Sequence, residues 1–187
     1  MLFRSRDPLL QDRYVHGLEK LIELAGKELD RTKHDPVFHD LARFYHDRLH
    51  HCRTMFCDRY RRDLVGAFRK FQDAGVLEII TCGATHGFLP LMREFPQAVR
   101  AQIQVARNDY RNCFGRDPRG IWLPECAYYP GLENYLQESE IRWFILDAHG
   151  LLYAEPRPAY GVFAPVFTPA GPAAFGRDIE SSKQVWS

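Results

Sequence analysis

Three polar runs in the sequence each follow a short apolar run that is typical of a buried strand. The first polar run covers residues 81–87, the second 124–126 and the third 147–150. In parallel α/β folds, the residues that do chemistry lie at the carboxyl ends of the strands. If the three strands are neighbours, their ends meet at one edge of the sheet. We therefore expect one shared cleft, lined by His86, Glu125, Asp147 and His149.

The surroundings of Glu125 favour a site for sugars. This residue follows Pro124 and lies between Trp122 and the pair Tyr128 and Tyr129. Glu is a poor helix N-cap, so a purely structural role explains it badly. Aromatic walls around a carboxylate suit the faces of sugar rings, and an ionised carboxylate can act as a nucleophile.

Structural roles remain open for several of the other residues. Asp147 follows a strand and is equally suited to be a helix N-cap. His86 and His149 are also suited to donate hydrogen bonds to backbone carbonyl groups. Cys126, beside Glu125, is a second conceivable nucleophile, but buried and inert cysteine is the commoner case.

The histidines and cysteines outside these runs do not predict a metal site. His46 and His50 have the spacing of metal ligands on a helix face, but charged neighbours indicate a solvated face instead. The 5 cysteines are an odd set without a C-x-x-C pair, which fits neither a disulfide framework nor a zinc knuckle. We expect no metal, no cofactor and a reducing, cytoplasmic location.

Helix start signals and apolar spacing predict the elements that position the site. Asp7-Pro8 and Asp35-Pro36 are each an N-cap acceptor followed by proline. From there, apolar residues recur with a period of about 3.6, which predicts one helix over 8–29 and an unusually long one over 36–74 that Gly75 ends. Two further helices are predicted over 96–113 and 129–138.

Short apolar runs predict strands over 76–80, 121–123 and 142–146, with a further strand-like run over 162–167 in a loop-rich stretch. Strands that alternate with helices imply right-handed crossovers and a parallel sheet, hence an α/β fold. No partner strand is predicted on one side of residues 143–145, so we expect an open sheet edge there.

Composition limits the classes of protein and partner. The 187 residues are 45% apolar, which suits one globular domain over 1–187. The 25 basic residues nearly cancel the 24 acidic ones, so neither nucleic acid nor a membrane surface is expected as a partner. No apolar run approaches the ~20 residues of a membrane span, and no secretory signal is expected at the N-terminus.

Four blocks of the sequence resemble family 57 glycoside hydrolases, most of all the α-1,4-glucan branching enzymes. They are Gly-Ala-Thr-His-Gly-Phe-Leu-Pro-Leu at 83–91, Ile-Trp-Leu-Pro-Glu-Cys-Ala-Tyr at 121–128, Phe-Ile-Leu-Asp-Ala-His-Gly at 144–150, and the block at 175–187. The resemblance implies a seven-stranded (β/α) barrel with Glu125 as the catalytic nucleophile. It also implies that His86 lies where the cleaved sugar binds and that Arg177 and Trp186 contact substrate.

The resemblance further implies that the family's opening strand precedes Met1 and that its acid/base aspartate follows Ser187. We therefore expect an internal piece of a larger enzyme, with an incomplete (β/α)7-type barrel, parallel strands and long N-terminal helices. The expected substrate is an α-1,4-glucan such as amylose, glycogen or starch, and the expected process is glycogen biosynthesis. The isolated chain is expected to be inactive.

Three other functions remain open at this point. Within the same family, an α-amylase or a 4-α-glucanotransferase would share Glu125. A metal-dependent polysaccharide deacetylase would instead use His86, Asp147 and His149 as ligands. A non-catalytic fragment would only bind glucan.

Overall fold

A computed structural model describes residues 5–186 of the chain. The chain divides into two compact units, Met1–Val76 and Leu77–Ser187, and each is described by itself. The single domain expected over 1–187 stays a prediction. Within the described residues, no helix is both long enough and apolar enough to cross a membrane.

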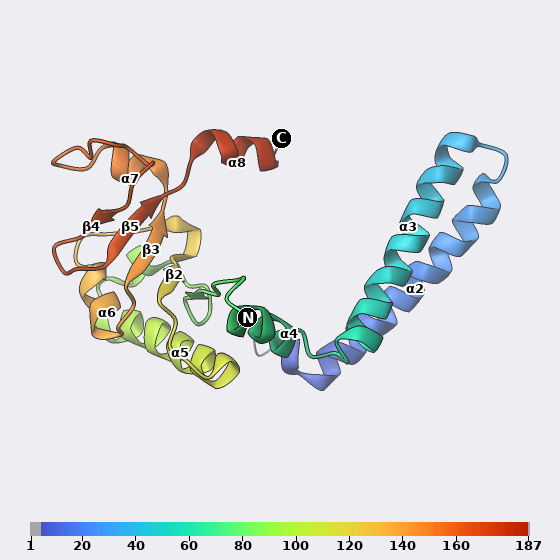
Figure 1. Cartoon of the computed structure of the whole chain (residues 1–187), viewed down its shortest axis with the longest axis horizontal. Coiled ribbons are helices and arrows are strands. Elements are labelled where there is room, and N and C mark those ends of the chain that lie inside the picture. Colours follow the sequence, from blue (N-terminus) through green and yellow to red (C-terminus); the bar gives the residue numbers. More distant parts are fainter. Residues whose placement is uncertain (1–4, 187) are drawn as a thin grey trace. The chain divides into compact units, whose positions relative to one another are not determined.

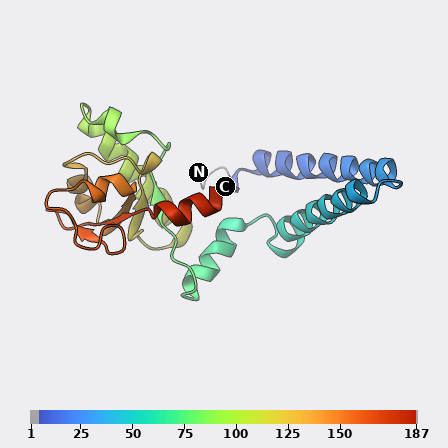
Figure 2. The ribbon, with the colours of Figure 1, turned by 90° about the horizontal axis from the view of Figure 1, so that it is seen from above.

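The first unit is built on a hairpin of two long helices, α2 (Pro8–Thr32) and α3 (Pro36–Thr54), which lie side by side in Figures 1 and 2. Both start as predicted, because the side chains of Asp7 and Asp35 accept hydrogen bonds from the backbone N–H groups of Leu10 and Phe38. An aromatic contact stabilises the hairpin near its open end. There, the rings of Tyr14 and Phe56 meet edge to face at 4.9 Å.

The prediction of a single long helix over 36–74 is wrong. α3 ends at Thr54, a π-helical turn follows over Met55–Arg59, and a separate helix, α4, covers Leu64–Asp73. The break occurs because the Asp63 side chain accepts from the N–H of Gly66 and starts a new helix. The apolar period continues across the break and hides it. Gly75, with φ of +74°, ends α4 in the left-handed conformation, as predicted.

The second unit contains a five-stranded sheet in the order β1-β2-β3-β5-β4. The first four strands in this order are parallel, and β4 pairs antiparallel with β5 (Figure 1). This confirms the predicted α/β fold with a parallel sheet, to which β4 adds one antiparallel strand that was not expected. The strands are β1 (Thr81–Cys82), β2 (Gly120–Trp122), β3 (Trp143–Leu146), β4 (Val166–Phe167) and β5 (Ala173–Gly176).

Two strand predictions need correction. The first strand lies at Thr81–Cys82 and not over 76–80. Just before it, the carbonyl of Ile79 accepts a hydrogen bond from the Tyr110 hydroxyl at 2.9 Å. The run predicted over 162–167 forms a strand only at Val166–Phe167. The open edge expected at 143–145 is also wrong, since β5, which the sequence did not predict, pairs with β3 along its whole length.

The helices of the second unit cover the sheet and carry part of the site. α5 confirms the helix predicted over 96–113, and Gly115 ends it with φ of +70°. α6 begins later than predicted, after Gly131 with φ of +98°. Two short helices, α7 and α8, were not predicted. The bounds are α5 (Pro96–Phe114), α6 (Leu132–Glu138), α7 (Ala148–Leu152) and α8 (Ile179–Trp186).

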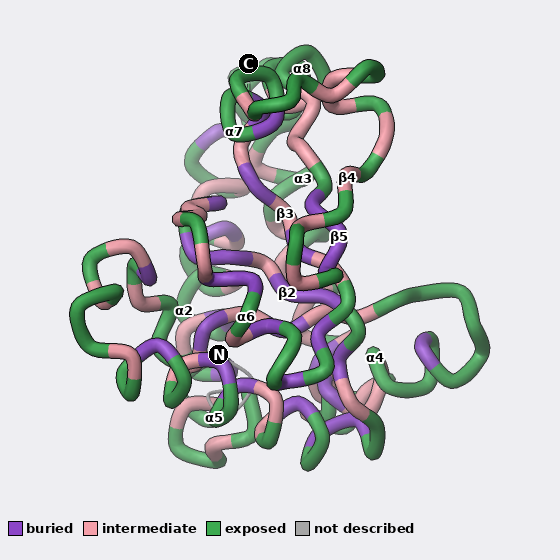
Figure 3. Tube along the Cα trace, turned by 90° about the vertical axis from the view of Figure 1, so that its left-hand side faces the viewer, coloured by how far each residue is buried: buried purple, intermediate pink, exposed green. Residues whose placement is uncertain are grey.

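The core of this unit lies between the strands and α5 and α6. Figure 3 shows the buried stretches along β2, β3 and β5. Phe144 of β3 is fully buried, and its ring stacks on that of Tyr128 at 5.4 Å. The rest of the cluster is aliphatic and includes Leu89, Val99, Ile103, Ile121, Leu123, Leu132, Leu136 and Ile141.

Truncating Phe144 to alanine is expected to lower the free energy of unfolding of the second unit by about 3 to 5 kcal/mol, because it empties a buried ring-sized space. All 3 tryptophans of the chain lie in this unit, so tryptophan fluorescence during urea unfolding reports on it. Phe163→Ala, at a side chain that is 85% exposed, serves as the control and should change little. Equal effects of the two substitutions would contradict this assignment of the core.

Candidate active site

The parallel pairing brings the ends of four strands to one edge of the sheet. His86 follows β1, Glu125 follows β2, Asp147 follows β3 and Arg177 follows β5. The register places Thr81 beside Ile121, and Ile121 beside Phe144. The loops that leave these strands therefore start at similar heights along the sheet.

His86 and Glu125, which follow neighbouring strands, are in contact. His86 Nε2 lies 3.4 Å from Glu125 Oε1, and their side chains are 37% and 72% exposed. Both residues adopt the left-handed backbone conformation, with φ of +58° and +57°. Non-glycine residues rarely occupy this region, and when they do they cluster at functional sites. The sequence prediction that these two side chains meet is supported by this geometry.

The loop that carries His86 is anchored to α5 through Gln102. The Gln102 side chain accepts from the N–H of Thr85 at 3.0 Å and donates to the Thr85 hydroxyl at 2.7 Å. The backbone carbonyl of Gln102 accepts from the N–H of Ala84 at 3.0 Å. Three hydrogen bonds from one helical residue thus fix the approach of the loop to Glu125.

The loop that carries Glu125 is held by a buried carboxylate on α6. Glu133 is only 6% exposed and accepts from the Tyr128 hydroxyl at 2.7 Å and from the N–H of Gly131 at 2.8 Å. A buried carboxylate needs such partners. Glu133 and Tyr128 therefore close the loop between Glu125 and α6.

Arg177 links the loop after β2 to the end of β5. Its guanidinium lies over the Trp122 ring, 5.8 Å from the centroid, and donates to Cys126 Sγ at 3.9 Å. Its backbone N–H donates to the carbonyl of Leu146 at 3.0 Å. Arg177 thus fixes one face of Trp122 and connects three of the four strand ends.

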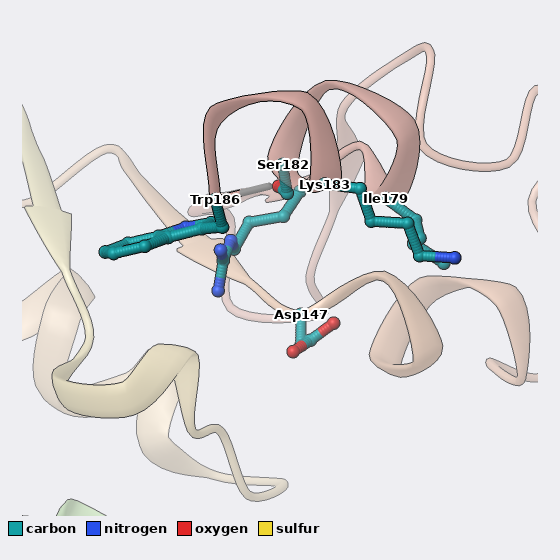
Figure 4. Close-up of a pocket in the computed structure, with 6 residues that line it drawn as sticks. Asp147, Ile179, Ser182, Lys183 and Trp186 are labelled. Carbon is teal, nitrogen blue, oxygen red and sulfur yellow. The ribbon is translucent and has the colours of Figure 1, made fainter.

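Arg177 also lines a cavity of about 220 Å³ between the end of β3 and α8. Figure 4 shows Asp147 facing the side chains of α8 across this space. Trp186, at the end of α8, is 83% exposed, so its ring is available to a ligand. The lining residues are Asp147, Arg177, Ile179, Ser182, Lys183 and Trp186.

The four residues expected in one shared cleft are divided in the structure between two neighbouring groups of side chains. Glu125 pairs with His86, whereas Asp147 lines the cavity with Arg177 and Trp186. Asp147 is also the N-cap of α7, since its side chain accepts from the N–H of Ala148 at 2.7 Å, so its alternative role is confirmed.

His149 lies at the surface and makes fewer contacts with the site than the sequence predicted. Its side chain is 75% exposed and its Nδ1 lies 3.7 Å from Asp147 Oδ1. It is not among the residues that line the cavity. A substrate-binding role for His149 stays a prediction.

Sequence reasoning missed several residues of the site. Ser182 and Lys183 lie on α8, which follows a Gly- and Pro-rich stretch, and the helix itself was not predicted. Cys82 was also missed, although its Sγ lies 3.0 Å from Nδ1 of His86. The spacing of four between Cys82 and His86 was visible, but a turn, and not a helix, brings them together.

Two alternative chemistries find no support at this site. Burial raises the pKa of the Cys126 thiol, which keeps it protonated and makes it a poor nucleophile. Over residues 5–186, no three His, Cys, Asp or Glu side chains are grouped to hold a metal ion, so His86, Asp147 and His149 do not form the ligand set of a deacetylase.

Comparison with known proteins identifies the family. The model of glycosyl hydrolase family 57 matches residues 3–185. The chain belongs to this family.

Two sequence relatives illustrate the range of similarity. A 1,4-alpha-glucan branching enzyme of Thermococcus kodakarensis is 36% identical, over 67% of this chain and 22% of the relative. A probable 1,4-alpha-glucan branching enzyme of Mycobacterium tuberculosis is 31% identical, over 71% of this chain and 24% of the relative. The chain thus spans roughly a fifth to a quarter of the curated relatives it matches.

Solved structures agree over almost the whole chain. The α-amylase AmyC from Thermotoga maritima matches with a TM-score of 0.86 and 46% identity, over 95% of this chain and 34% of that one. A GH57-type branching enzyme from Pyrococcus horikoshii matches with a TM-score of 0.85 and 29% identity, over 98% of this chain and 36% of that one. The predicted fold class is confirmed as an α/β fold with a mostly parallel sheet and long N-terminal helices, which matches part of these solved family 57 structures.

The hydroxyl group of Tyr128, which closes the Glu125 loop, is expected to make the free energy of unfolding decrease at alkaline pH. Burial, and then the hydrogen bond to Glu133 and its negative charge, raise the pKa of Tyr128. The contribution of this hydroxyl group to the free energy of unfolding is therefore complete below the unfolded-state pKa of about 10. It is lost as the pH rises toward the higher folded-state pKa.

Tyr128→Phe should lower the free energy of unfolding by about 1 to 2 kcal/mol at neutral pH, and the gap to the wild type should narrow above pH ~10. Urea unfolding followed by tryptophan fluorescence at several pH values measures both effects. Tyr160→Phe, at a side chain that is 72% exposed, is the control. If the difference in free energy of unfolding between wild type and Tyr128→Phe stays constant with pH, the Tyr128 hydroxyl does not form this hydrogen bond to Glu133.

Proposed function

We propose that this protein is an α-glucan-active retaining enzyme in which Glu125 is the nucleophile. The observation that carries the proposal is the contact between Glu125 and His86 at the carboxyl edge of a parallel sheet, beside an arginine stacked on Trp122. A retaining enzyme needs a carboxylate that is free to attack a sugar. Glu125, with a side chain that is 72% exposed, meets this need.

Each neighbour has a chemical task in this proposal. The imidazole of His86 holds one oxygen of the Glu125 carboxylate and is close enough to reach hydroxyl groups of the bound sugar. Trp122 and Trp186 offer aromatic faces against which sugar rings pack. Asp147 and Arg177 supply a charged acceptor and donor that suit sugar hydroxyls in the cavity.

The reaction then proceeds in two halves. The Glu125 carboxylate attacks the anomeric carbon, the bond to the leaving oxygen breaks, and a second carboxylic acid protonates that oxygen. The resemblance assigns this acid/base group to an aspartate in a later block. In the second half, an acceptor hydroxyl group attacks the glycosyl-enzyme and frees Glu125.

We propose 1,4-α-glucan branching as the outcome, in which the acceptor is a 6-hydroxyl group of another glucan chain. The two relatives named as branching enzymes, at 36% and 31% identity, support this choice. A second candidate is α-amylase activity, in which water is the acceptor. The 46% identity to AmyC favours it. Product analysis with amylose separates the two outcomes, since only branching creates α-1,6 links.

The nucleophile role predicts covalent labelling of Glu125 by α-glucosyl fluoride. Glu125 attacks the anomeric carbon, the C–F bond breaks, and fluoride leaves with the electron pair, so no acid group is needed. Intact-mass spectrometry of the 187-residue chain should show one added glucosyl unit. Glu125→Gln should lower the labelling rate by at least about a thousandfold.

Glu94→Gln is the matched control, because Glu94 is as exposed as Glu125, with 74% of its side chain accessible against 72%. It should label at the wild-type rate. Labelling that persists in Glu125→Gln would place the nucleophile elsewhere.

A further inference from the structure

The ring of His86 bridges two side chains whose chemistry differs. Its Nε2 lies 3.4 Å from Glu125 Oε1, and its Nδ1 lies 3.0 Å from the sulfur of Cys82. Cys82 is not one of the groups that the proposed reaction uses. The contact raises the question of which ring nitrogen carries the proton.

For a neutral imidazole, the donors and acceptors around the ring allow one consistent arrangement. An ionised carboxylate only accepts hydrogen bonds, so Glu125 requires a donor at Nε2. A neutral imidazole has a proton on one nitrogen only, so Nδ1 must then be an acceptor. Burial raises the pKa of the Cys82 thiol, and a thiol that keeps its proton is a donor.

We propose that Cys82 is a positioning residue that donates its S–H to Nδ1 of His86 and thereby fixes the tautomer with the proton on Nε2, facing Glu125. The inference rests on the proposed role of Glu125 as nucleophile. In the other tautomer, the ring would turn a lone pair toward the carboxylate, and the two groups would repel each other.

The backbone supports this role because it fixes the thiol and the ring independently. Cys82 belongs to β1 and pairs in register with Trp122 of β2. His86 ends a tight turn in which its N–H donates to the carbonyl of Gly83 at 3.0 Å, and its φ of +58° directs the chain back. The thiol is thus held by the sheet and the ring by the turn.

The consequence for the reaction is a carboxylate with one oxygen held and the other free. The Nε2–H group holds Oε1 of Glu125, so Oε2 remains available to attack the sugar. Without the thiol, only the contact with Glu125, whose side chain is 72% exposed, favours the proton on Nε2. A larger share of the rings then takes the other tautomer, which does not hold the carboxylate. We therefore expect a slower attack without any change in the reacting groups.

The tautomer is measured directly by two-dimensional ¹H–¹⁵N spectra of the histidine side chains, recorded on the ¹⁵N-labelled chain without substrate. The signal of His86 is assigned by its loss in His86→Gln. The wild type should show protonated Nε2 and unprotonated Nδ1. A proton on Nδ1 of the wild-type ring would overturn the inference, whatever the variants do.

Three variants then test the thiol. Cys82→Ala should give a mixture of tautomers and slow labelling by α-glucosyl fluoride by about three- to tenfold, the effect of one hydrogen bond of ordinary net strength. Cys82→Ser keeps a donor and should restore much of the wild-type tautomer and rate. Cys52→Ala, a change in α3 of the first unit, should alter neither. An unchanged tautomer and rate in Cys82→Ala would overturn the inference.

These readouts separate the inference from the proposed function. The first informative result would be the expected tautomer in the wild type and a mixture in Cys82→Ala, without covalent labelling of Glu125. It would support the role of the thiol and contradict the role of Glu125 as nucleophile. Labelling at Glu125 with the opposite tautomer would support the nucleophile and contradict the thiol's role.

Discussion

The parallel pairing of β1, β2, β3 and β5 is the constraint on which the site depends. Because parallel strands run in the same direction, each chain segment leaves the sheet at the same edge. One edge therefore receives His86, Glu125, Asp147 and Arg177 from loops that are far apart in the sequence. Antiparallel pairing of any of these strands would send its loop to the opposite edge. The fully buried side chains of Ile121 and Phe144 hold β2 and β3 in this register.

The loops beyond the strands add a second level of order. The backbone at Glu125 and His86 is left-handed, a conformation that costs free energy in residues with a side chain. A neighbouring helix holds each loop: Gln102 of α5 holds the loop of His86, and Glu133 of α6 holds the loop of Glu125. A polar side chain on a covering helix thus positions a candidate site residue that it does not touch, so the helices are part of what shapes the site.

The sequence was informative wherever a local rule is decisive. Asp7 and Asp35 began helices as expected because an N-cap needs only its own first turn. The rule that strand ends in parallel folds carry function pointed to Glu125 and His86, and their side chains are in contact in the structure. The break at Asp63 was hidden, since the apolar period runs on through it. β5 was not predicted because Ala173 and Ala174, after a stretch rich in Gly and Pro, give no strand signal, and because β5 is held by pairing with β3, which is distant in the sequence.

In the function that we propose, Glu125 and the cavity beside α8 bind one α-glucan together. A crystal structure of the Glu125→Gln protein with a maltooligosaccharide tests it most directly, because the variant keeps the shape of the site and removes the nucleophile. We expect a sugar ring packed against Trp186, hydroxyl groups in contact with Arg177, and an anomeric carbon facing residue 125. An oligosaccharide bound away from both Arg177 and residue 125 would contradict it.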